Sequence, residues 1–250
     1  MADVNENSSP SNNSVFAMLK EKKIDTVLWI LRFLTLIFGV LYVLPLTGNQ
    51  QICYQRALMA GALTHFLRLR QRLGGVRFNM QFLQEMFLED SCHYLLFCFI
   101  FWGSHPITMA LMPIFLFALL HWTSFTIQIL NVRENNVIAN LNESTLARIL
   151  NNFVSKYSQT CLQIIACCEI FLMPAVVIMI FSGKSNFLIP FIYYRFLTLR
   201  YMSRRNPSTR QAFGQLRFAV EQTVNKPACP QILRNLAYKL INIICRMAPN

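Results

Sequence analysis

The chain has 250 residues, 54% of them hydrophobic and only 14% charged, with a formal net charge of +12. This composition is too apolar for a water-soluble globular surface and predicts an integral membrane protein. The positive charge is concentrated late in the chain, where ten Lys and Arg residues but a single acid, Glu221, lie from Arg195 onward. Beside a bilayer, such a basic segment favours anionic lipid as its partner, and no nucleic-acid recognition motif accompanies it. We therefore predict lipid binding and no nucleic-acid binding.

The hydrophobic pattern predicts an all-α integral membrane protein made of multi-pass helical hairpins and C-terminal amphipathic helices. Residues 1–19 are rich in Asn and Ser and predict a disordered tail. A multi-pass membrane domain is predicted over 20–205 and a basic cytosolic tail over 206–250. A helix rises about 1.5 Å per residue, so about 20 apolar residues cross a hydrocarbon core of roughly 30 Å. The predicted apolar helices cover about 24–46, 52–73, 92–103, 106–130, 161–181 and 187–202.

Short turns join these helices in pairs. The turns near residues 47–51, 103–106 and 182–186 contain one charged residue, Lys184, whereas the longer connections carry basic residues. Because Lys and Arg resist translocation, this distribution predicts cytosolic termini and three short lumenal hairpin tips. Arg32, inside the first helix, is expected to snorkel toward the cytosolic interface.

Two alternatives to this arrangement are open. Residues 92–130 can form one long, irregular span in place of two helices. In a three-span topology, residues 52–67 and 186–201 only lie in the membrane, and residues 131–160 are lumenal. Asn142 begins an N-glycosylation sequon, Asn-Glu-Ser, which is usable only in that three-span topology.

Residues 191–207 predict the exit of the last membrane helix on the cytosolic side. The segment begins apolar and aromatic and then becomes basic before an Asn-Pro break. Aromatic rings suit the headgroup region, and arginines stay on the cytosolic side. The basic residues of this exit are Arg195, Arg200, Arg204 and Arg205.

Two amphipathic helices are predicted in the basic tail, over 208–224 and 230–247. Advancing 100° per residue, the second gathers its large apolar side chains in one half-turn and its basic ones in the other, as in a helix that lies in the membrane surface. Packing of this apolar face on the protein's own helices is the alternative. The predicted membrane-surface residues are Ile232, Leu233, Leu236, Leu240, Ile241, Ile243, Ile244 and Met247.

Glu169 is an acid inside a predicted membrane helix, where an unpaired carboxylate costs several kcal/mol. It lies fifteen residues before the turn at Lys184, and Arg195 and Arg200 lie eleven and sixteen residues after it. An ion pair across the hairpin therefore fits the geometry. We predict this structural role in preference to ion transport, because no second intramembrane acid accompanies Glu169.

The sequence predicts no catalytic, cofactor-binding or metal site. Glu89, Asp90 and His93 fall within one helical turn, but a di-metal carboxylate site needs acids from several helices. The positive end of a helix explains the two acids. The eight cysteines lack zinc-ligand spacing. No phosphate-binding loop, dinucleotide fingerprint or serine-hydrolase motif occurs in the sequence, so we do not expect an enzyme.

Four segments resemble the transmembrane protein 33 family, which includes the insect Krüppel homologue 2 and fungal pore-membrane nucleoporins. They are residues 89–96, 169–175, 191–207 and 226–230, and the resemblance extends from about residue 17 to residue 248. It implies a multi-pass protein of the endoplasmic reticulum and nuclear envelope. It also implies links to tubular network shaping with reticulon-type proteins, to nuclear pore distribution with nucleoporins, and to the unfolded-protein response.

The sequence pattern and the family resemblance together support one hypothesis, that of a non-enzymatic protein that organises the tubular reticulum and the nuclear envelope. Short hairpins in the cytosolic leaflet, together with an amphipathic helix on its surface, add area to one leaflet and favour curvature. One alternative is a regulator or component of an ion channel or transporter built around Glu169. Another is an adaptor in unfolded-protein-response signalling or at the nuclear pore, whose tail recruits the partner.

Overall fold

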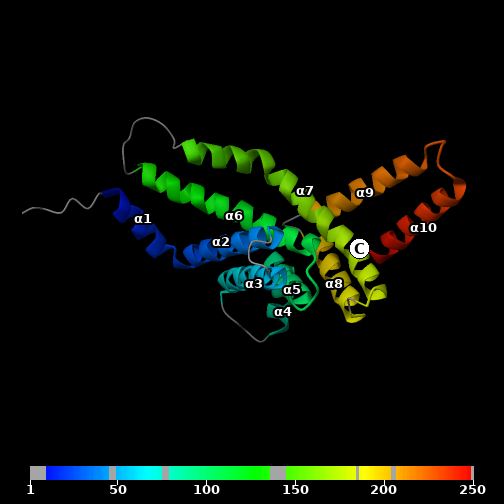
Figure 1. The fold of residues 1–250 in the computed structure, drawn as a ribbon, viewed down its shortest axis with the longest axis horizontal. Coiled ribbons are helices and arrows are strands. Elements are labelled where there is room, and N and C mark those ends of the chain that lie inside the picture. The colour runs from blue at the N-terminus through cyan, green and yellow to red at the C-terminus, as the bar shows by residue number, and fades with distance from the viewer. Residues whose placement is uncertain are drawn as a thin grey trace, which may run out of the picture.

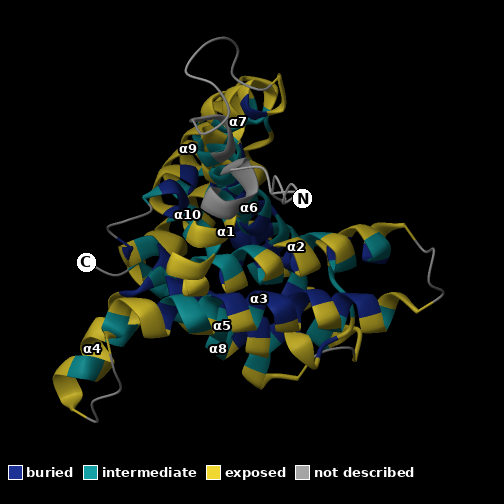
Figure 2. Ribbon diagram, turned by 90° about the vertical axis from the view of Figure 1, so that its left-hand side faces the viewer, coloured by how far each residue is buried: buried dark blue, intermediate teal, exposed yellow. Residues whose placement is uncertain are grey.

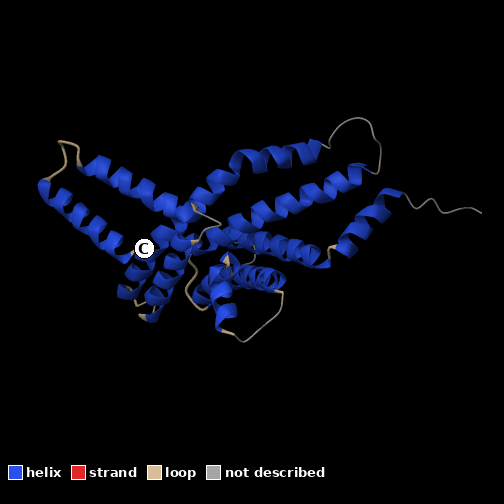
Figure 3. Ribbon diagram, turned by 180° about the vertical axis from the view of Figure 1, so that it is seen from behind, coloured by secondary structure: helices blue, strands red, loops and turns tan. Residues whose placement is uncertain are grey.

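The computed structural model confirms the all-α fold, with no strand among the residues it describes (Figure 3). The described residues are 10–44, 49–74, 79–135, 145–183, 186–203 and 207–248. The helices are α1 (Pro10–Glu21), α2 (Lys23–Val43), α3 (Gln50–Leu73), α4 (Met80–Leu88), α5 (Asp90–Trp102), α6 (Thr108–Asn135), α7 (Thr145–Phe181), α8 (Leu188–Met202), α9 (Ser208–Val224) and α10 (Gln231–Met247).

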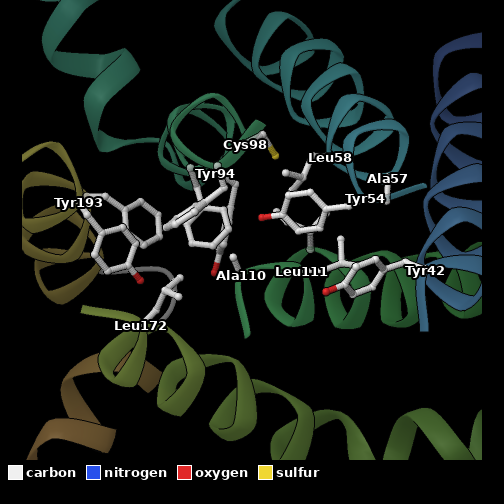
Figure 4. Packing of buried hydrophobic residues seen from close by; sticks show 14 of the residues in the cluster. Tyr42, Tyr54, Ala57, Leu58, Tyr94, Cys98, Ala110, Leu111, Leu172 and Tyr193 are labelled. Carbon is white, nitrogen blue, oxygen red and sulfur yellow. The ribbon is translucent and has the colours of Figure 1, made fainter. Parts of the chain in front are cut away.

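The central helices pack antiparallel around an aromatic core (Figures 1 and 4). Between α2 and α3, Arg68 Nη1 lies 3.9 Å from Asp25 Oδ1 near one end, and the rings of Tyr42 and Tyr54 lie 5.6 Å apart near the other. α5 lies against α3 and α8, and α6 against α2 and α7. The largest fully buried apolar side chains of this core are Tyr54, Leu58, Phe97, Phe101, Ile114, Leu172, Tyr193 and Phe196.

Two glycines let α6 approach α2 and α3 closely. A Cβ atom on Gly39 would lie 2.6 Å from Cδ2 of Phe115, and one on Gly61 would lie 2.6 Å from Cγ2 of Ile114. Carbon atoms do not approach so closely, so a larger residue at either position displaces α6. Small residues at helix contacts are common in membrane proteins for this reason.

The N-terminal region differs from the predicted disordered tail over 1–19, because α1 begins at Pro10 and lies against the end of α6. Hydrogen bonding at the junction of α1 and α2 also connects the segment to the membrane domain, since Thr26 Oγ1 donates to the carbonyl of Leu19 at 3.1 Å. Residues 1–9 lie outside the described part of the chain.

Both helices around the predicted polar connection 131–160 extend farther than their apolar sequence. α6 continues to Asn135, beyond the expected end at 130, and α7 begins at Thr145, before the expected start at 161. The residues concerned contain no Gly or Pro, so nothing in their backbone preference ends the helix at the edge of the apolar segment.

The apolar segment 92–130 is broken at residues 103–107, which excludes one continuous span. α5 packs mainly on α3 and α8, whereas α6 packs mainly on α2 and α7. The two helices nevertheless touch, since the ring centroids of Tyr94 on α5 and Phe117 on α6 lie 4.8 Å apart.

The beginning of α2 and the end of α6 lie at the same end of the helical assembly. Trp29 Nε1, on α2, donates to Thr126 Oγ1, on α6, at 2.9 Å. At the other end, Tyr42 and Thr108 hydroxyls lie 3.0 Å apart. The hairpin topology has four crossings between the start of α2 and the end of α6, and the three-span alternative has two. Both therefore place these two ends on the same side of the membrane, and the observed arrangement agrees with both.

Three helices are long and apolar enough to cross a bilayer, among the described residues: α2, α6 over Thr108–Val132, and α7. The outer side of α2 is apolar and exposed along its length, as expected for a surface that faces lipid (Figure 2). α5 and α8 have 13 and 15 residues, or about 20 and 22 Å, which is short of a hydrocarbon core of roughly 30 Å.

Candidate functional site

α10 carries a continuous exposed apolar surface. None of its residues is buried, and the exposed fraction is 81% for Ile232 and 51% for Leu240. Seven of the eight predicted membrane-surface residues are exposed in this way. Ile241 is the exception and is half-buried, because it lies on the same side of the helix as Arg234.

The opposite side of α10 packs on α9. Arg234 Nε donates to the carbonyl of Val224 at 3.0 Å, and Tyr238 donates its hydroxyl to Asn225 Oδ1 at 3.0 Å. α10 then runs back toward α8, where Tyr194 donates its hydroxyl to the carbonyl of Met247 at 2.9 Å (Figure 1). The helix is therefore held by polar contacts, and the apolar arc points away from the helix that supports it.

α9 connects this surface helix to the membrane domain. Its beginning is buried, with Thr209 and Ala212 against α7, and its later part is mostly exposed, with Val224 at the end buried again. In the exposed part, Arg217 Nε donates to Glu221 Oε1 at 2.8 Å, and this bond raises the pKa of the Arg217 guanidinium.

Glu169 lies at the centre of a buried polar cluster and is fully inaccessible to solvent. Its carboxylate accepts hydrogen bonds from the Tyr94 hydroxyl, from Arg200 Nε at 3.1 Å and from Thr209 Oγ1 at 3.0 Å. Its backbone carbonyl accepts a bond from the Tyr193 hydroxyl at 2.7 Å. Both carboxylate oxygens thus have donors, and the donors come from α5, α8 and α9.

Arg200 extends the cluster to the beginning of α5. Its Nη1 lies 3.2 Å from Asp90 Oδ1, and the same carboxylate oxygen accepts a 2.7 Å bond from Ser203 Oγ. The guanidinium also stacks on Tyr94, with Cζ 4.8 Å from the ring centroid. One arginine therefore bridges two acids, Asp90 and Glu169, that are 79 residues apart in sequence.

The arginines of the predicted basic membrane exit lie in different environments. Arg200 is 1% exposed and belongs to the buried cluster, whereas Arg195 is exposed. Arg204 and Arg205 lie outside the described residues. Of the two arginines considered as partners of Glu169, Arg200 makes the ion pair across the α7–α8 hairpin. Sequence reasoning missed the roles of Tyr94, Thr209 and Ser203, whose hydroxyls carry no distinguishing pattern.

The cluster does not have the composition of a metal centre. No group of three or more His, Cys, Asp or Glu side chains converges among the described residues. Glu89 turns away from the cluster toward Arg72, whose Nη1 lies 2.6 Å from Glu89 Oε2. The arrangement joins four helices through charge-assisted hydrogen bonds, and these are stronger than hydrogen bonds between neutral groups.

The family described as Transmembrane protein 33/Nucleoporin POM33 matches residues 7–250. The chain belongs to this family. It is 46% identical over 251 residues to "Transmembrane protein 33" of Homo sapiens, covering 100% of this chain and 99% of the relative. The chain is 39% identical to "Transmembrane protein 33 homolog" of Caenorhabditis elegans, and the match covers 95% of this chain and 86% of the relative. It is 36% identical to "Krueppel homolog 2" of Drosophila melanogaster, and that match covers 91% of this chain and 79% of the relative. No solved structure matches the chain.

The family assignment confirms the resemblance seen in the sequence and is that of a membrane protein, described as transmembrane and as a nucleoporin and not as an enzyme. Three of the segments that resemble the transmembrane protein 33 family, 89–96, 169–175 and 191–207, meet in the buried cluster. They supply Asp90, Tyr94, Glu169, Arg200 and Ser203.

Proposed function

We propose that this chain is a non-enzymatic protein of the endoplasmic reticulum membrane and nuclear envelope that helps to organise the tubular network and the distribution of nuclear pores. Its partners in this role are the lipid bilayer with its anionic lipids, reticulon-type membrane-shaping proteins and nucleoporins. The names of its relatives, a transmembrane protein and a nucleoporin, support the membrane and pore setting.

The observation that carries this proposal is the exposed apolar arc of α10. Seven large apolar side chains that face away from α9 are costly in water, whereas the headgroup boundary of a bilayer accommodates them. The basic residues of the same helix, Lys239 and Arg246, favour an anionic lipid surface. Shallow insertion of such a helix adds area to one leaflet and bends the membrane toward it.

The short helices α5 and α8 support the same mechanism. Their lengths of about 20 and 22 Å leave them roughly a third short of the hydrocarbon core. A protein with such helices occupies one leaflet more than the other, or thins the bilayer beside them. The basic connections favour the cytosolic leaflet as the more occupied one, in agreement with the side on which α10 lies in the hairpin topology.

The test is rescue of reticulum morphology after depletion of the protein, measured as the ratio of sheets to tubules. Wild type is expected to restore the ratio, and Leu240→Glu to fail, because it places a charge at the centre of the apolar arc. Asn235→Glu is the matched control. It makes the same charge change on an exposed residue about 140° around the helix from Leu240 and is expected to rescue.

Three results separate this proposal from its alternatives. Rescue by Leu240→Glu equal to that by wild type would contradict membrane shaping through α10. An unchanged network together with altered lumenal calcium would point to regulation of transport. If the cytosolic tail alone retained a nucleoporin or a signalling protein in a pulldown, the adaptor hypothesis would be favoured.

A further inference from the structure

A cavity of about 240 Å³ lies between α2, α3, α5 and α6, separate from the apolar arc of α10. It is smaller than the sites of drug-sized ligands, which occupy roughly 300–1,000 Å³, and has the volume of about eight water molecules. Its lining combines apolar side chains with a group of charged and polar ones. The side chains that carry charge or free hydrogen-bonding groups into it are Arg32, Arg68, Arg72, Asp90, His65, His121 and Ser91.

Arg32 is the unusual member of this lining. The residue is only 8% exposed, so it does not snorkel to the interface as its sequence position suggested. Nevertheless, it has no hydrogen-bond or ion-pair partner among the described residues. It lies nine positions after Lys23, or about 14 Å along α2, where an unpaired arginine costs several kcal/mol. A buried cation without a protein partner indicates a partner from outside the protein.

The acids near the cavity are already engaged. Asp25 pairs with Arg68 at 3.9 Å, and Glu89 pairs with Arg72 at 2.6 Å. Asp90 lines the cavity, but its Oδ1 accepts bonds from Arg200 and Ser203. The positive charge of Arg32 is therefore left in excess.

The free hydrogen-bonding groups are arranged around Arg32. His65 and His121 have no hydrogen-bond partners among the residues that the structure describes, and His65 is fixed by stacking on Tyr94 at 5.2 Å. The hydroxyls of Thr35 and Thr64 donate to their own helices, at 2.9 and 2.8 Å. Those two hydroxyls are therefore engaged, but Arg32 together with the two imidazoles and the Ser91 hydroxyl is a set that recognises phosphate oxygens.

We propose that this cavity binds the phosphate of an anionic ligand, and that the ligand is a phospholipid headgroup from the leaflet on the side where α2 begins. The membrane geometry favours a lipid source over a soluble one. α5 begins at Asp90, on the wall of the cavity, so the apolar surface of this short helix ends at the level of the cavity. Hydrophobic mismatch draws the headgroup region toward that level, within reach of Arg32.

The experiment uses the full-length protein purified in detergent, with thermal unfolding as the measure of binding and native mass spectrometry as the measure of stoichiometry. The probes are dioleoyl phosphatidic acid, dioleoyl phosphatidylcholine and inorganic phosphate. Phosphatidic acid is expected to raise the unfolding temperature of the wild type, because a ligand that binds only the native state stabilises it. Phosphatidylcholine, which has no net charge, is expected to act more weakly.

Arg32→Gln is expected to lower the affinity for phosphatidic acid by roughly ten- to a hundredfold, as for loss of a hydrogen bond to a charged group. Its stability without lipid is expected to equal or exceed that of the wild type, since no protein partner loses its ion pair. Arg70→Gln is the matched control, because Arg70 is an exposed arginine of α3 that does not line the cavity. It is expected to bind phosphatidic acid as the wild type does.

Three results would overturn the proposal: no phosphatidic acid binding by the wild type, equal affinity in Arg32→Gln, or equal loss in Arg70→Gln. Stabilisation by inorganic phosphate that depends on Arg32, without an effect of phosphatidic acid, would support the phosphate site and overturn the lipid source. If Arg32→Gln does not fold, Arg32→Lys provides the test, because it keeps the charge but loses the bidentate geometry. Undiminished affinity in that variant would then count against the site.

Discussion

Arg200 Nε lies 3.1 Å from one carboxylate oxygen of Glu169 and 3.3 Å from the other, so the α7–α8 hairpin is closed by an ion pair within the protein interior. Both residues are at most 1% exposed. Such a pair offers little net stabilisation relative to apolar residues, but removal of one partner leaves a buried charge uncompensated. The pair therefore constrains how α7, α8 and α5 fit together.

Glu169→Gln is expected to destabilise the protein by about 3–5 kcal/mol, the usual cost of breaking a buried ion pair. The amide retains the size of the carboxylate but leaves Arg200 paired with Asp90 alone. Unfolding of the full-length protein in detergent, induced by heat or by sodium dodecyl sulfate, measures the effect. Glu221→Gln is the control, because its partner Arg217 is exposed and little change is expected. Equal unfolding midpoints for the two variants would contradict a structural role for Glu169.

Much of the helical framework follows from hydrophobic periodicity. The expected helix over 208–224 has the bounds observed for α9, and α10 begins one residue after the predicted 230. The ion pair of Glu169 with Arg200 was within reach of sequence reasoning, because the two residues flank one short turn at similar distances. The spacing of two residues along the sequence can therefore predict a contact between them when both lie in one hairpin.

The rest of the cluster depends on contacts between distant helices. Asp90 and Arg200 are 110 residues apart and meet only because α5 packs antiparallel on α8. From sequence, Asp90 is sufficiently explained as an acid at a helix N-terminus. Arg32 is a second case that the sequence does not reveal. Its long side chain permits snorkelling, but the packing of α2 against α3 and α6 directs it into the cavity. These outcomes are set by tertiary packing and leave no local pattern.

Gly61→Ala is expected to destabilise the protein by about 1–3 kcal/mol through overpacking. The added methyl would lie 2.6 Å from Cγ2 of Ile114, a β-branched side chain that cannot easily rotate away. Gly214→Ala is the matched control, because no atom of another group lies within 4 Å of a Cβ there, and alanine favours the helix by about 1 kcal/mol. Unfolding midpoints are expected to move in opposite directions. A stabilising Gly61→Ala would show that the contact between α3 and α6 is looser than described.

Asn142 is expected to carry no glycan, although it begins a sequon. The residue itself lies outside the described part of the chain, but the hydrogen bond from Trp29 to Thr126 brings the end of α6 to the side where α2 begins. The lysines before α2 favour the cytosol for that side, where glycosylation does not occur. The measurement is the gel mobility of the full-length protein from microsomes, with and without peptide N-glycosidase. A sequon-bearing insertion after Gly183, long enough to clear the membrane, is the control and should be glycosylated. A glycan on Asn142 would instead place the connection between α6 and α7 in the lumen, and α10 would have to be reassigned with it.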